Sequence, residues 1–288
     1  MILCGDFFQL PPVTKHGQPP KPFAFEVDAW RRCVGANTVE LRTVFRQADG
    51  VFVRMLNRIR WGVCTAEMAH VLRTESGADF EKNDGIEATT LNTHKADVEQ
   101  RNRERLDELP GEKVVFAAND TGEPQLLAQL QASCQARATL ELKVGAHVIL
   151  LKNLSLGERL CNGSIGRVVR FTAGHKYPIV RFASGLETMV KPEKFVLRGG
   201  AADSAQRVQV PLELGWNFSV HRSQGMSLDR CCMSLGSVFE FGQAYVALSR
   251  ARSMEGLKLL DFEARCVRAH PSVIEFYRAL GHEAPDVE

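Results

Sequence analysis

Two stretches in the second half of the sequence carry residue types that bind phosphate groups. Segment 221–225, His-Arg-Ser-Gln-Gly, places a histidine, an arginine, a hydroxyl and an amide on one turn that ends in glycine. Segment 245–252 has apolar residues at helical spacing and ends in arginines at positions 250 and 252. A guanidinium group binds phosphate oxygens through a planar fork of hydrogen bonds. The alternative for either stretch alone is an ordinary turn and a surface helix with solvated arginines.

Near the N-terminus, Asp6 and Gln9 stand on a loop that the sequence makes rigid. Residues 2–5 (Ile-Leu-Cys-Gly) are typical of the end of a buried strand, and residues 6–13 of the loop that leaves it. Pro11 and Pro12 exclude helix and fix an extended path. Since α/β proteins place ligand-sensing groups after the carboxyl ends of strands, Gln9 is a candidate for such a role. A plain strand-to-loop exit is the alternative.

Arg46 lies at a predicted junction between a strand and a helix. Residues 38–41 favour a strand, and Asp49 precedes an amphipathic helix. The apolar face of that helix consists of Val51, Phe52, Met55, Leu56 and Ile59. Together with Gln9 and Arg250, Arg46 is suited to the terminal phosphate of a nucleotide, because phosphoryl transfer depends on positioning and charge neutralisation. Spacing alone does not establish that the three converge, and a surface arginine is the alternative.

Composition limits the class of protein. The 288 residues are 44% hydrophobic and 24% charged, with a net charge of +2, which is ordinary for a globular protein. Any nucleic-acid surface must therefore come from local patches rather than from the overall charge. No apolar run approaches the length of a membrane span, and no signal peptide is recognisable. The eight cysteines form no C-x-x-C pair, which favours reduced thiols in an intracellular compartment over a zinc framework.

The remaining pattern predicts an α/β chain with an inserted β subdomain. Helices are expected at 23–33, 65–73 and 98–109, and weakly after a turn at 119–122; strands are expected at 88–92 and 256–260. Between them, strands at 142–150, 165–171, 179–182 and 187–190 indicate a small antiparallel barrel. Segment 211–220 alternates and resumes the main domain. The tail 264–288, which ends acidic, is expected to be peripheral.

Four motifs in order resemble one family: Gly5-Asp6-Phe7-Phe8-Gln9-Leu10-Pro11-Pro12-Val13, Val44-Phe45-Arg46-Gln47, the stretch from His221 to Asp229, and the stretch from Gly242 to Arg252. They are similar to the petite-integration-frequency (Pif-type) superfamily-one DNA helicases, relatives of RecD. The resemblance covers about residues 1–262. It implies an α/β fold in which a RecA-like second domain of the P-loop NTPase class carries an inserted SH3-like β-barrel. The implied parts are the tail of a first RecA-like domain (1–36), the second RecA-like domain (37–141 and 201–265), the barrel (142–200) and a C-terminal tail (266–288).

The resemblance also implies roles for particular residues. Gln9 corresponds to a phosphate-sensing glutamine, Arg46 and Arg250 to two arginine fingers on the γ-phosphate, and Asp6 belongs to the same nucleotide site. The implied DNA-binding residues are His221, Arg222, Ser223, Gln224 and Gly225, and, on weaker grounds, His94 and Lys95. The implied activity is ATP-dependent 5′-to-3′ DNA unwinding, with ATP and Mg²⁺ as cofactors.

One departure from the family pattern is severe. The sequence contains no G-x-x-x-x-G-K-[ST] loop, the element that cradles nucleotide phosphates, and no Asp-Glu pair before Asp6 to hold magnesium. We therefore expect no metal site in this chain and no ATP hydrolysis by this chain alone. It would be the C-terminal portion of a helicase, whether as a fragment, an incomplete gene model or a short protein.

Two other hypotheses stay open. One is a non-hydrolysing module that binds single-stranded DNA through the 221–225 turn and the barrel, with Phe171 and Phe182 available to stack on bases. The other is a remnant without a stable fold. For the helicase, the resemblance implies single-stranded, forked or quadruplex DNA as partner, a monomer, no membrane, and a location in the nucleus or mitochondrion. The implied pathways are telomere maintenance, DNA repair and recombination.

Overall fold

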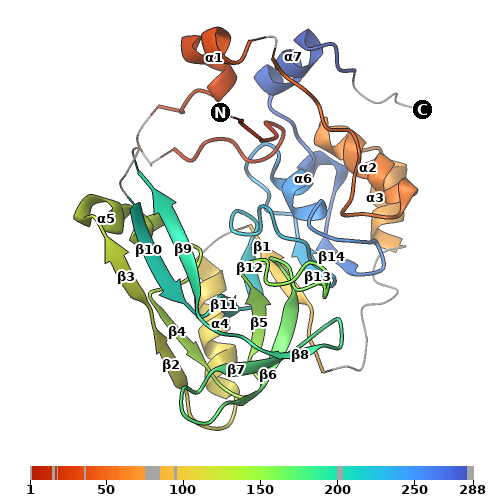
Figure 1. The fold of residues 1–288 in the computed structure, drawn as a ribbon. Coiled ribbons are helices and arrows are strands. Elements are labelled where there is room, and N and C mark those ends of the chain that lie inside the picture. The colour runs from red at the N-terminus through yellow and green to blue at the C-terminus, as the bar shows by residue number, and fades with distance from the viewer. Residues whose placement is uncertain are drawn as a thin grey trace. The chain divides into compact units, whose positions relative to one another are not determined.

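The computed structural model describes residues 2–14, 17, 19–35, 37–74, 85–93, 96–199 and 204–283, apart from the side chains of residues 96 and 97. The chain forms two compact units. The first, which we call the split unit, consists of Met1–Ala78 and Met233–Glu288. The second, which we call the central unit, consists of Asp79–Cys232. Figure 1 shows the elements of both. Strand β13, Cys231–Ser234, contains the second boundary between them.

The split unit is mainly helical. Its elements are the 3₁₀ helices η1 (Ala24–Glu26) and η2 (Ala264–Cys266), the helices α1 (Asp28–Cys33), α2 (Gly50–Arg60), α3 (Ala66–Thr74), α6 (Gln243–Leu248) and α7 (Pro271–Ala279), and strand β14 (Leu257–Asp261). The predicted start of α2 is confirmed: the Asp49 carboxylate caps it by accepting from the Val51 amide at 2.7 Å. Four of the five predicted core residues of α2 are buried, but Val51 in its first turn is 48% exposed.

An aromatic cluster forms the core beside α7. Phe8, Phe23, Trp61, Val273 and Tyr277 are buried together, and the Phe8 and Tyr277 rings stack at 4.5 Å between centroids. The prediction that 264–288 is peripheral is therefore wrong for α7. The acidic residues that suggested it follow the helix, whereas the helix itself carries apolar side chains that pack inward.

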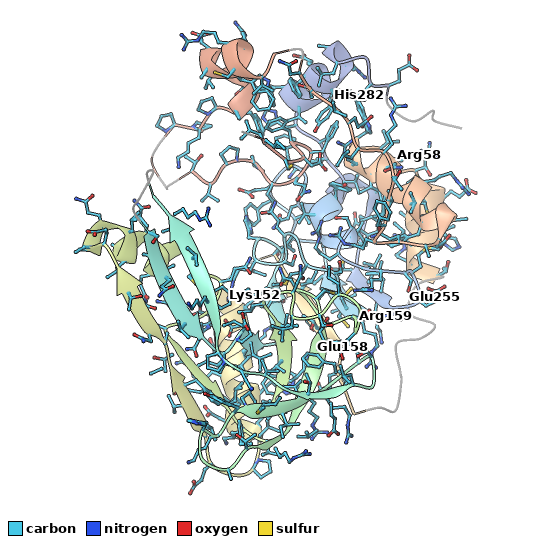
Figure 2. All side chains as sticks on the ribbon, in the orientation of Figure 1. Arg58, Lys152, Glu158, Arg159, Glu255 and His282 are labelled. Atoms are coloured by element: carbon cyan, nitrogen blue, oxygen red, sulfur yellow. The ribbon has the colours of Figure 1, made fainter. Side chains whose placement is uncertain are left out.

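Two strand predictions in the split unit are also wrong. Residues 2–5 and 38–41 are not strands, and Ile2, Leu3, Val39 and Leu41 are between 61% and 90% exposed. An apolar alternating segment becomes a strand only when a neighbouring strand supplies hydrogen bonds and a packed layer covers it. In the described structure, segment 38–41 is instead tied to the chain beyond α7, because His282 Nδ1, labelled in Figure 2, lies 2.9 Å from Glu40 Oε2.

In the central unit, a parallel strand pair carries the predicted helix. Strands β1 (Thr89–Asn92) and β12 (Asn217–Ser219) pair with Leu91 opposite Phe218. Helix α4 (Ala96–Glu108) packs on β12. The Asn102 side chain fixes this contact, donating to the Asn217 carbonyl and accepting from its amide, both at 2.8 Å. The predicted strand and helix are confirmed.

The rest of the central unit is antiparallel β structure. A five-stranded sheet has the order β11-β5-β6-β7-β8, a three-stranded sheet the order β3-β10-β9, and β2 pairs with β4. The bounds are β2 Val114–Ala117, β3 Asn119–Gly122, β4 Thr139–Leu142, β5 His147–Leu150, β6 Ile165–Phe171, β7 Pro178–Phe182, β8 Glu187–Met189, β9 Glu193–Arg198, β10 Ser204–Gln209 and β11 Leu212–Leu214, with helix α5 at Pro124–Ser133. Lys152 Nζ, labelled in Figure 2, links the end of β5 to β9 through Glu193 Oε2 at 2.9 Å.

Several boundaries differ from the sequence prediction. The predicted turn at 119–122 is strand β3, paired with β10. The predicted strand 142–150 is two strands, because Gly145 adopts a φ of 90° between them. Segment 211–220 also divides, so that β11 pairs with β5 while β12 pairs with β1. By contrast, the strand 165–171 and the helix after 123 are confirmed.

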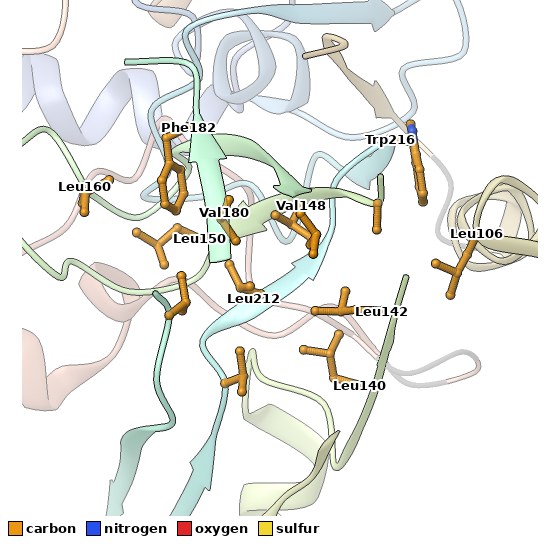
Figure 3. Packing of buried hydrophobic residues seen from close by; sticks show 14 residues of the cluster. Leu106, Leu140, Leu142, Val148, Leu150, Leu160, Val180, Phe182, Leu212 and Trp216 are labelled. Carbon is orange, nitrogen blue, oxygen red and sulfur yellow. The ribbon is translucent and has the colours of Figure 1, made fainter. Parts of the chain in front are cut away.

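The core of the central unit is built from strands and α4 together. Leu106 of α4 packs with Leu142, Val148, Val180 and other buried apolar residues (Figure 3). Phe182 belongs to this core and is 1% exposed. The hypothesis that Phe182 stacks on nucleic-acid bases is therefore wrong, since its ring is covered. Among the residues that the structure describes, no helix is both long and apolar enough to cross a membrane.

Candidate functional site

The loop that carries Gln9 rests on the start of α6. The Gln9 amide donates to the Asp6 carbonyl at 3.1 Å, which closes a turn. Gly242, the N-cap of α6, has a φ of 73°, and a side chain there would collide with the carbonyl oxygens of Phe8 and Gln9. Glycine is required at this position both for its backbone angle and for this close approach. The loop and the start of α6 are therefore in close contact.

Arg46 and Arg250 meet at Ser249. Arg46 Nη1 donates to the Ser249 carbonyl at 3.1 Å, and Arg250 Nη2 donates to the Ser249 hydroxyl at 2.8 Å. Gln47, which is buried, donates through Nε2 to the carbonyls of Ser249 (3.2 Å) and Ala251 (2.8 Å). The chain after α6 is therefore held against the Arg46 segment by side chains from positions about 200 residues away in sequence, at separations of 202 to 204.

The electrostatics of Arg250 are unusual. It is 2% exposed, and burial, followed by repulsion from Arg46, lowers the pKa of its guanidinium from 12.5 to about 10. Attraction by Tyr245 and Asp6 acts in the opposite direction and is outweighed. The group remains charged at neutral pH. An anion that approached the two arginines would offset both the cost of burying the charge and the repulsion between the guanidinium groups, so a negatively charged ligand would be stabilised here.

The Asp6 carboxylate binds Arg60 of α2 and Tyr277 of α7. Arg60 Nη2 and Nε lie 2.9 and 3.2–3.3 Å from the carboxylate oxygens, and the Tyr277 hydroxyl donates to Oδ1 at 3.3 Å. Burial alone would lower the pKa of Arg60, but the Asp6 charge and hydrogen bonds outweigh it and raise that pKa. The guanidinium also stacks on the Phe8 and Tyr277 rings, at 4.5 and 4.9 Å.

In the central unit, segment 221–225 forms the predicted turn. The Ser223 amide donates to the Ser219 carbonyl and the Met226 amide to the Ser223 carbonyl, both at 3.0 Å. Gly225 ends the turn with a φ of 81°. Ser223 is fully buried, and its hydroxyl donates to the Val220 carbonyl at 2.7 Å. This hydroxyl shapes the turn from within.

Arg222 is also bound inside the central unit. Its Nη2 lies 3.0 Å from Glu213 Oε2 and donates to the Gln135 carbonyl at 2.9 Å, and the guanidinium lies over the Phe218 ring at 4.9 Å. Glu213, with only 3% of its side chain exposed, is paired at 2.7 Å with Arg137 as well. The charge of Arg222 is therefore compensated within the fold.

The β5–β6 connection supports the turn from another side. Gly163 adopts a φ of 98°, and a Cβ at this position would lie 2.6 Å from the Ser227 carbonyl oxygen and 2.7 Å from its amide nitrogen. The Ser227 amide donates to the Asn162 carbonyl at 3.3 Å. The Asn162-Gly163 turn predicted from sequence thus contacts the chain directly after the 221–225 turn.

Comparison with known proteins relates the whole chain to one group. Residues 125–171 match the family model described as DNA helicase Pif1, 2B domain. ATP-dependent DNA helicase PIF1 of Xenopus laevis is 45% identical over 98% of this chain and 44% of its own length. The crystal structure of Pif1 helicase from Candida albicans matches with a TM-score of 0.68 and 35% identity, over 96% of this chain and 68% of that one.

The chain belongs to the Pif1 helicase family. A Pif1 from Bacteroides, solved in complex with ADP-AlF3 and ssDNA, also matches, with a TM-score of 0.60 and 27% identity over 96% of this chain and 66% of that one. The mixed α/β fold predicted from sequence is confirmed, and it matches the RecA-like Pif1 structures. The chain spans 44% of the length of the Xenopus relative.

For this Pif1-family chain, the fold brings Arg46 and Arg250 together, and it fixes the Gln9 loop and Asp6 against α6 in the same unit. Residues 221–225 lie in the central unit, with His221 and Gln224 half-buried. His94 and Lys95 lie outside the described residues. Among the residues that are described, no group of three or more histidine, cysteine, aspartate or glutamate side chains is arranged to hold a metal ion.

Sequence reasoning missed the roles of Gln47, Arg60 and Tyr277. Gln47 stands next to Arg46 in a motif that had already been singled out, so that adjacency was an available signal. Arg60 ends a helix that reads as ordinary, and its bond to Asp6 spans 54 positions. The Tyr277 bond to Asp6 spans 271 positions. No local pattern reports contacts at such separations.

Proposed function

We propose that the chain is the C-terminal portion of an ATP-dependent 5′-to-3′ DNA helicase that couples ATP hydrolysis to movement along single-stranded DNA. Membership of the Pif1 family supports this proposal. The observation that carries it is the meeting of Arg46 and Arg250 at Ser249, with Arg250 buried and its pKa lowered. Two guanidinium groups held side by side form a site for a phosphoryl group.

In this proposal, Gln9, Arg46 and Arg250 hold the γ-phosphate end of ATP. ATP, when bound, supplies the phosphoanhydride bond whose cleavage drives movement. Arg46 and Arg250 neutralise the charge on the transferred group, and the rigid loop keeps Gln9 at a fixed distance from α6. Asp6 acts in this site by binding Arg60. We assign none of the described acidic residues to Mg²⁺.

The central unit would bind the DNA backbone. His221, Gln224 and Gly225 would face the DNA, while the buried Ser223 holds the shape of the turn and the half-buried Arg222 is paired with Glu213. The sheets around 142–200 would act as the inserted SH3-like subdomain between the parts of a second RecA-like domain, 37–141 and 201–265. Residues 1–36 would complete a first RecA-like domain, and 266–288 would form a C-terminal extension. His94 and Lys95 remain candidates for the same DNA surface.

By resemblance, the protein would act as a monomer on single-stranded, forked or quadruplex DNA. Its pathways would be telomere maintenance, repair and recombination, in the nucleus or mitochondrion. A Pif1 from Bacteroides in complex with ssDNA and a nucleotide supports single-stranded DNA and ATP as the ligands.

Binding of a fluorescein-labelled oligothymidine, followed by anisotropy, tests the DNA part on this chain. We expect binding that weakens steeply as salt increases, because released counterions drive association with phosphates. ATP turnover tests the other part, in a full-length protein that includes the glycine loop. DNA-stimulated turnover there would support the helicase. DNA binding without any turnover would favour the non-hydrolysing module instead, and no binding at low salt would refute both.

A further inference from the structure

Gln9 lies on a short loop whose backbone amides bind Asp6 and Tyr277. Three successive amides are bound there: Phe7 N donates to the Tyr277 hydroxyl at 3.3 Å, Phe8 N to Asp6 Oδ1 at 3.2 Å and Gln9 N to the Asp6 carbonyl at 3.1 Å. Each acceptor is either Asp6 or a group bound to it. The bonds of the Phe7 and Phe8 amides therefore depend on the Asp6 side chain or on a group bound to it, whereas the Gln9 amide binds the Asp6 backbone.

Three side chains from distant parts of the split unit bind Asp6: Arg60, Tyr277 and Tyr245, the last through its own side-chain hydrogen bond. Arg60 of α2 contacts both carboxylate oxygens, and both side chains of this pair are largely buried, with 17% and 18% of their area exposed. Tyr277 of α7 acts in two directions, since its hydroxyl accepts from Phe7 N and donates to Asp6 Oδ1. Burial, followed by the Asp6 charge, raises the pKa of this hydroxyl, so it stays protonated and able to donate.

The apolar parts of the same residues form one stack. The Phe8 and Tyr277 rings stack on each other, with 4.5 Å between centroids and an interplanar angle of 14°. The central carbon of the Arg60 guanidinium lies beside this pair, 4.5 Å from the Phe8 centroid and 4.9 Å from the Tyr277 centroid. Phe8 precedes Gln9, and its carbonyl lies against Gly242 at the start of α6. A change in Arg60 or Tyr277 is thus transmitted to the backbone of the loop within one residue of Gln9.

We propose that Arg60 and Tyr277 are positioning residues for phosphate sensing: they hold Asp6, and through it the 7–9 backbone, so that Gln9 keeps its place against α6. This role rests on the proposed function. It makes α7, which lies beyond the four motifs, a part of the nucleotide-sensing apparatus. Neither residue touches the nucleotide in this scheme.

Tyr277→Phe tests the proposal, because it removes one hydroxyl and keeps the ring that stacks on Phe8. Amide hydrogen exchange in this chain should become about 5-fold faster at Phe7, the effect of one lost hydrogen bond. The matched control is Tyr177→Phe, on the β6–β7 hairpin of the central unit, which should leave these amides unchanged. A thermal melt confirms that both variants fold.

The functional readout is ATP turnover in the full-length protein. Tyr277→Phe should lower the DNA-stimulated kcat about 10-fold, as expected for a displaced positioning group. The KM for ATP and the Kd for single-stranded DNA should stay unchanged, and rates are expressed per DNA-binding molecule. If the variant were merely less well folded, kcat per DNA-binding molecule would stay unchanged. A lower kcat on this scale therefore reports a displaced positioning group and not a loss of folded protein.

Arg60→Lys provides a second variant, with Arg54→Lys on the same helix as its control. Lysine keeps the charge but not the two-nitrogen contact with Asp6, so exchange at Phe8 should accelerate and kcat should fall. Unchanged exchange in both variants, or faster exchange with unchanged kcat, would overturn the proposal and leave the proposed function standing. Absence of turnover in the unsubstituted full-length protein would refute the proposed function, and this inference with it.

Discussion

Two sites, Arg250 in the split unit and Arg222 in the central unit, treat positive charge in opposite ways. In the split unit, Arg250 stays charged next to Arg46, and burial lowers its pKa to about 10. In the central unit, Arg222 is paired with the buried Glu213, while His147 is neutral, because burial and the charges of three arginines lower its pKa to about 3. A buried cation whose pKa is lowered by its surroundings is stabilised when it binds an anionic ligand. A cation that is paired with a carboxylate of the same unit contributes instead to the stability of the fold.

The largest effect is expected in the split unit. Arg250→Ala and Arg46→Ala in the full-length protein should each lower ATP turnover by about 10³–10⁵-fold, the range for arginine fingers. Single-stranded DNA binding should be retained, because the proposed DNA surface lies in the central unit. Arg265→Ala, an exposed arginine of the same unit, is the control and should leave turnover unchanged. Retained ATP turnover in both variants would show that Arg46 and Arg250 do not act on the nucleotide.

The compensated arginines of the central unit predict a loss of stability rather than of chemistry. Glu213→Ala leaves Arg137 and Arg222 without their shared carboxylate and should lower the free energy of unfolding by about 3 kcal/mol. Urea denaturation measures this change, with the exposed Glu112→Ala as control. A loss below about 0.5 kcal/mol, the size typical of surface substitutions, would remove the contrast between the two units.

His147 predicts a dependence of stability on pH. It is 2% exposed, and neither ring nitrogen has a hydrogen-bond partner within the described structure. Since the pKa is about 3 when folded and 6.5 when unfolded, the unfolded chain binds the extra proton between these values. The contribution of His147 to the free energy of unfolding is therefore fully present above pH 6.5. It decreases as the pH falls, by about 2 kcal/mol at pH 5.

His147→Leu should remove this contribution. Urea denaturation between pH 4.5 and 7 should show a shallower pH dependence, reduced by up to one proton per molecule. His175→Leu, on the exposed β6–β7 hairpin, should keep the original slope. An unchanged slope in His147→Leu would mean that this histidine is not the group that stays neutral on folding.

The smallest effect concerns Arg222. If its charge serves the fold, Arg222→Met should leave the salt dependence of single-stranded DNA binding nearly unchanged. A lysine or arginine that neutralises one phosphate of a single strand contributes about 0.7 to the slope of log K against log salt. A decrease of that size in a variant that still melts cooperatively would place Arg222 on the DNA and weaken the comparison between the units.

Local signals in the sequence predicted several elements well. Asp49 before an amphipathic run specified the start of α2, because capping and helical periodicity act over a few residues. The strand 165–171 and the turn at Asn162-Gly163 followed from alternation and turn chemistry. The motifs containing Gln9, Arg46 and Arg250 also pointed to one chemistry, since the side chains that bind phosphate are few.

The same signals failed where partners decide the structure. Residues 2–5 and 38–41 have the composition of strands, yet they pair with none in the described structure. Segment 211–220 alternates as one strand would, but its two halves find partners in different sheets. The sequence of helix α7 predicts a peripheral segment, but the Phe8 and Trp61 rings pack against the helix and bury its apolar side chains. Local periodicity does not predict which distant segments form hydrogen bonds with one another or bury one another's side chains.

By itself, therefore, the sequence determined which side chains are present for phosphate chemistry, the turn geometry at Gly225 and the family to which the motifs belong. Only the tertiary structure decided that Arg46 and Arg250 both bind Ser249, that Arg222 pairs with Glu213 while Ser223 is buried, and that Tyr277 binds Asp6. The physical reason is the sequence distance over which each kind of interaction acts. Backbone conformation responds to neighbours within a few residues, whereas the charge and exposure of a side chain depend on whatever the fold brings beside it.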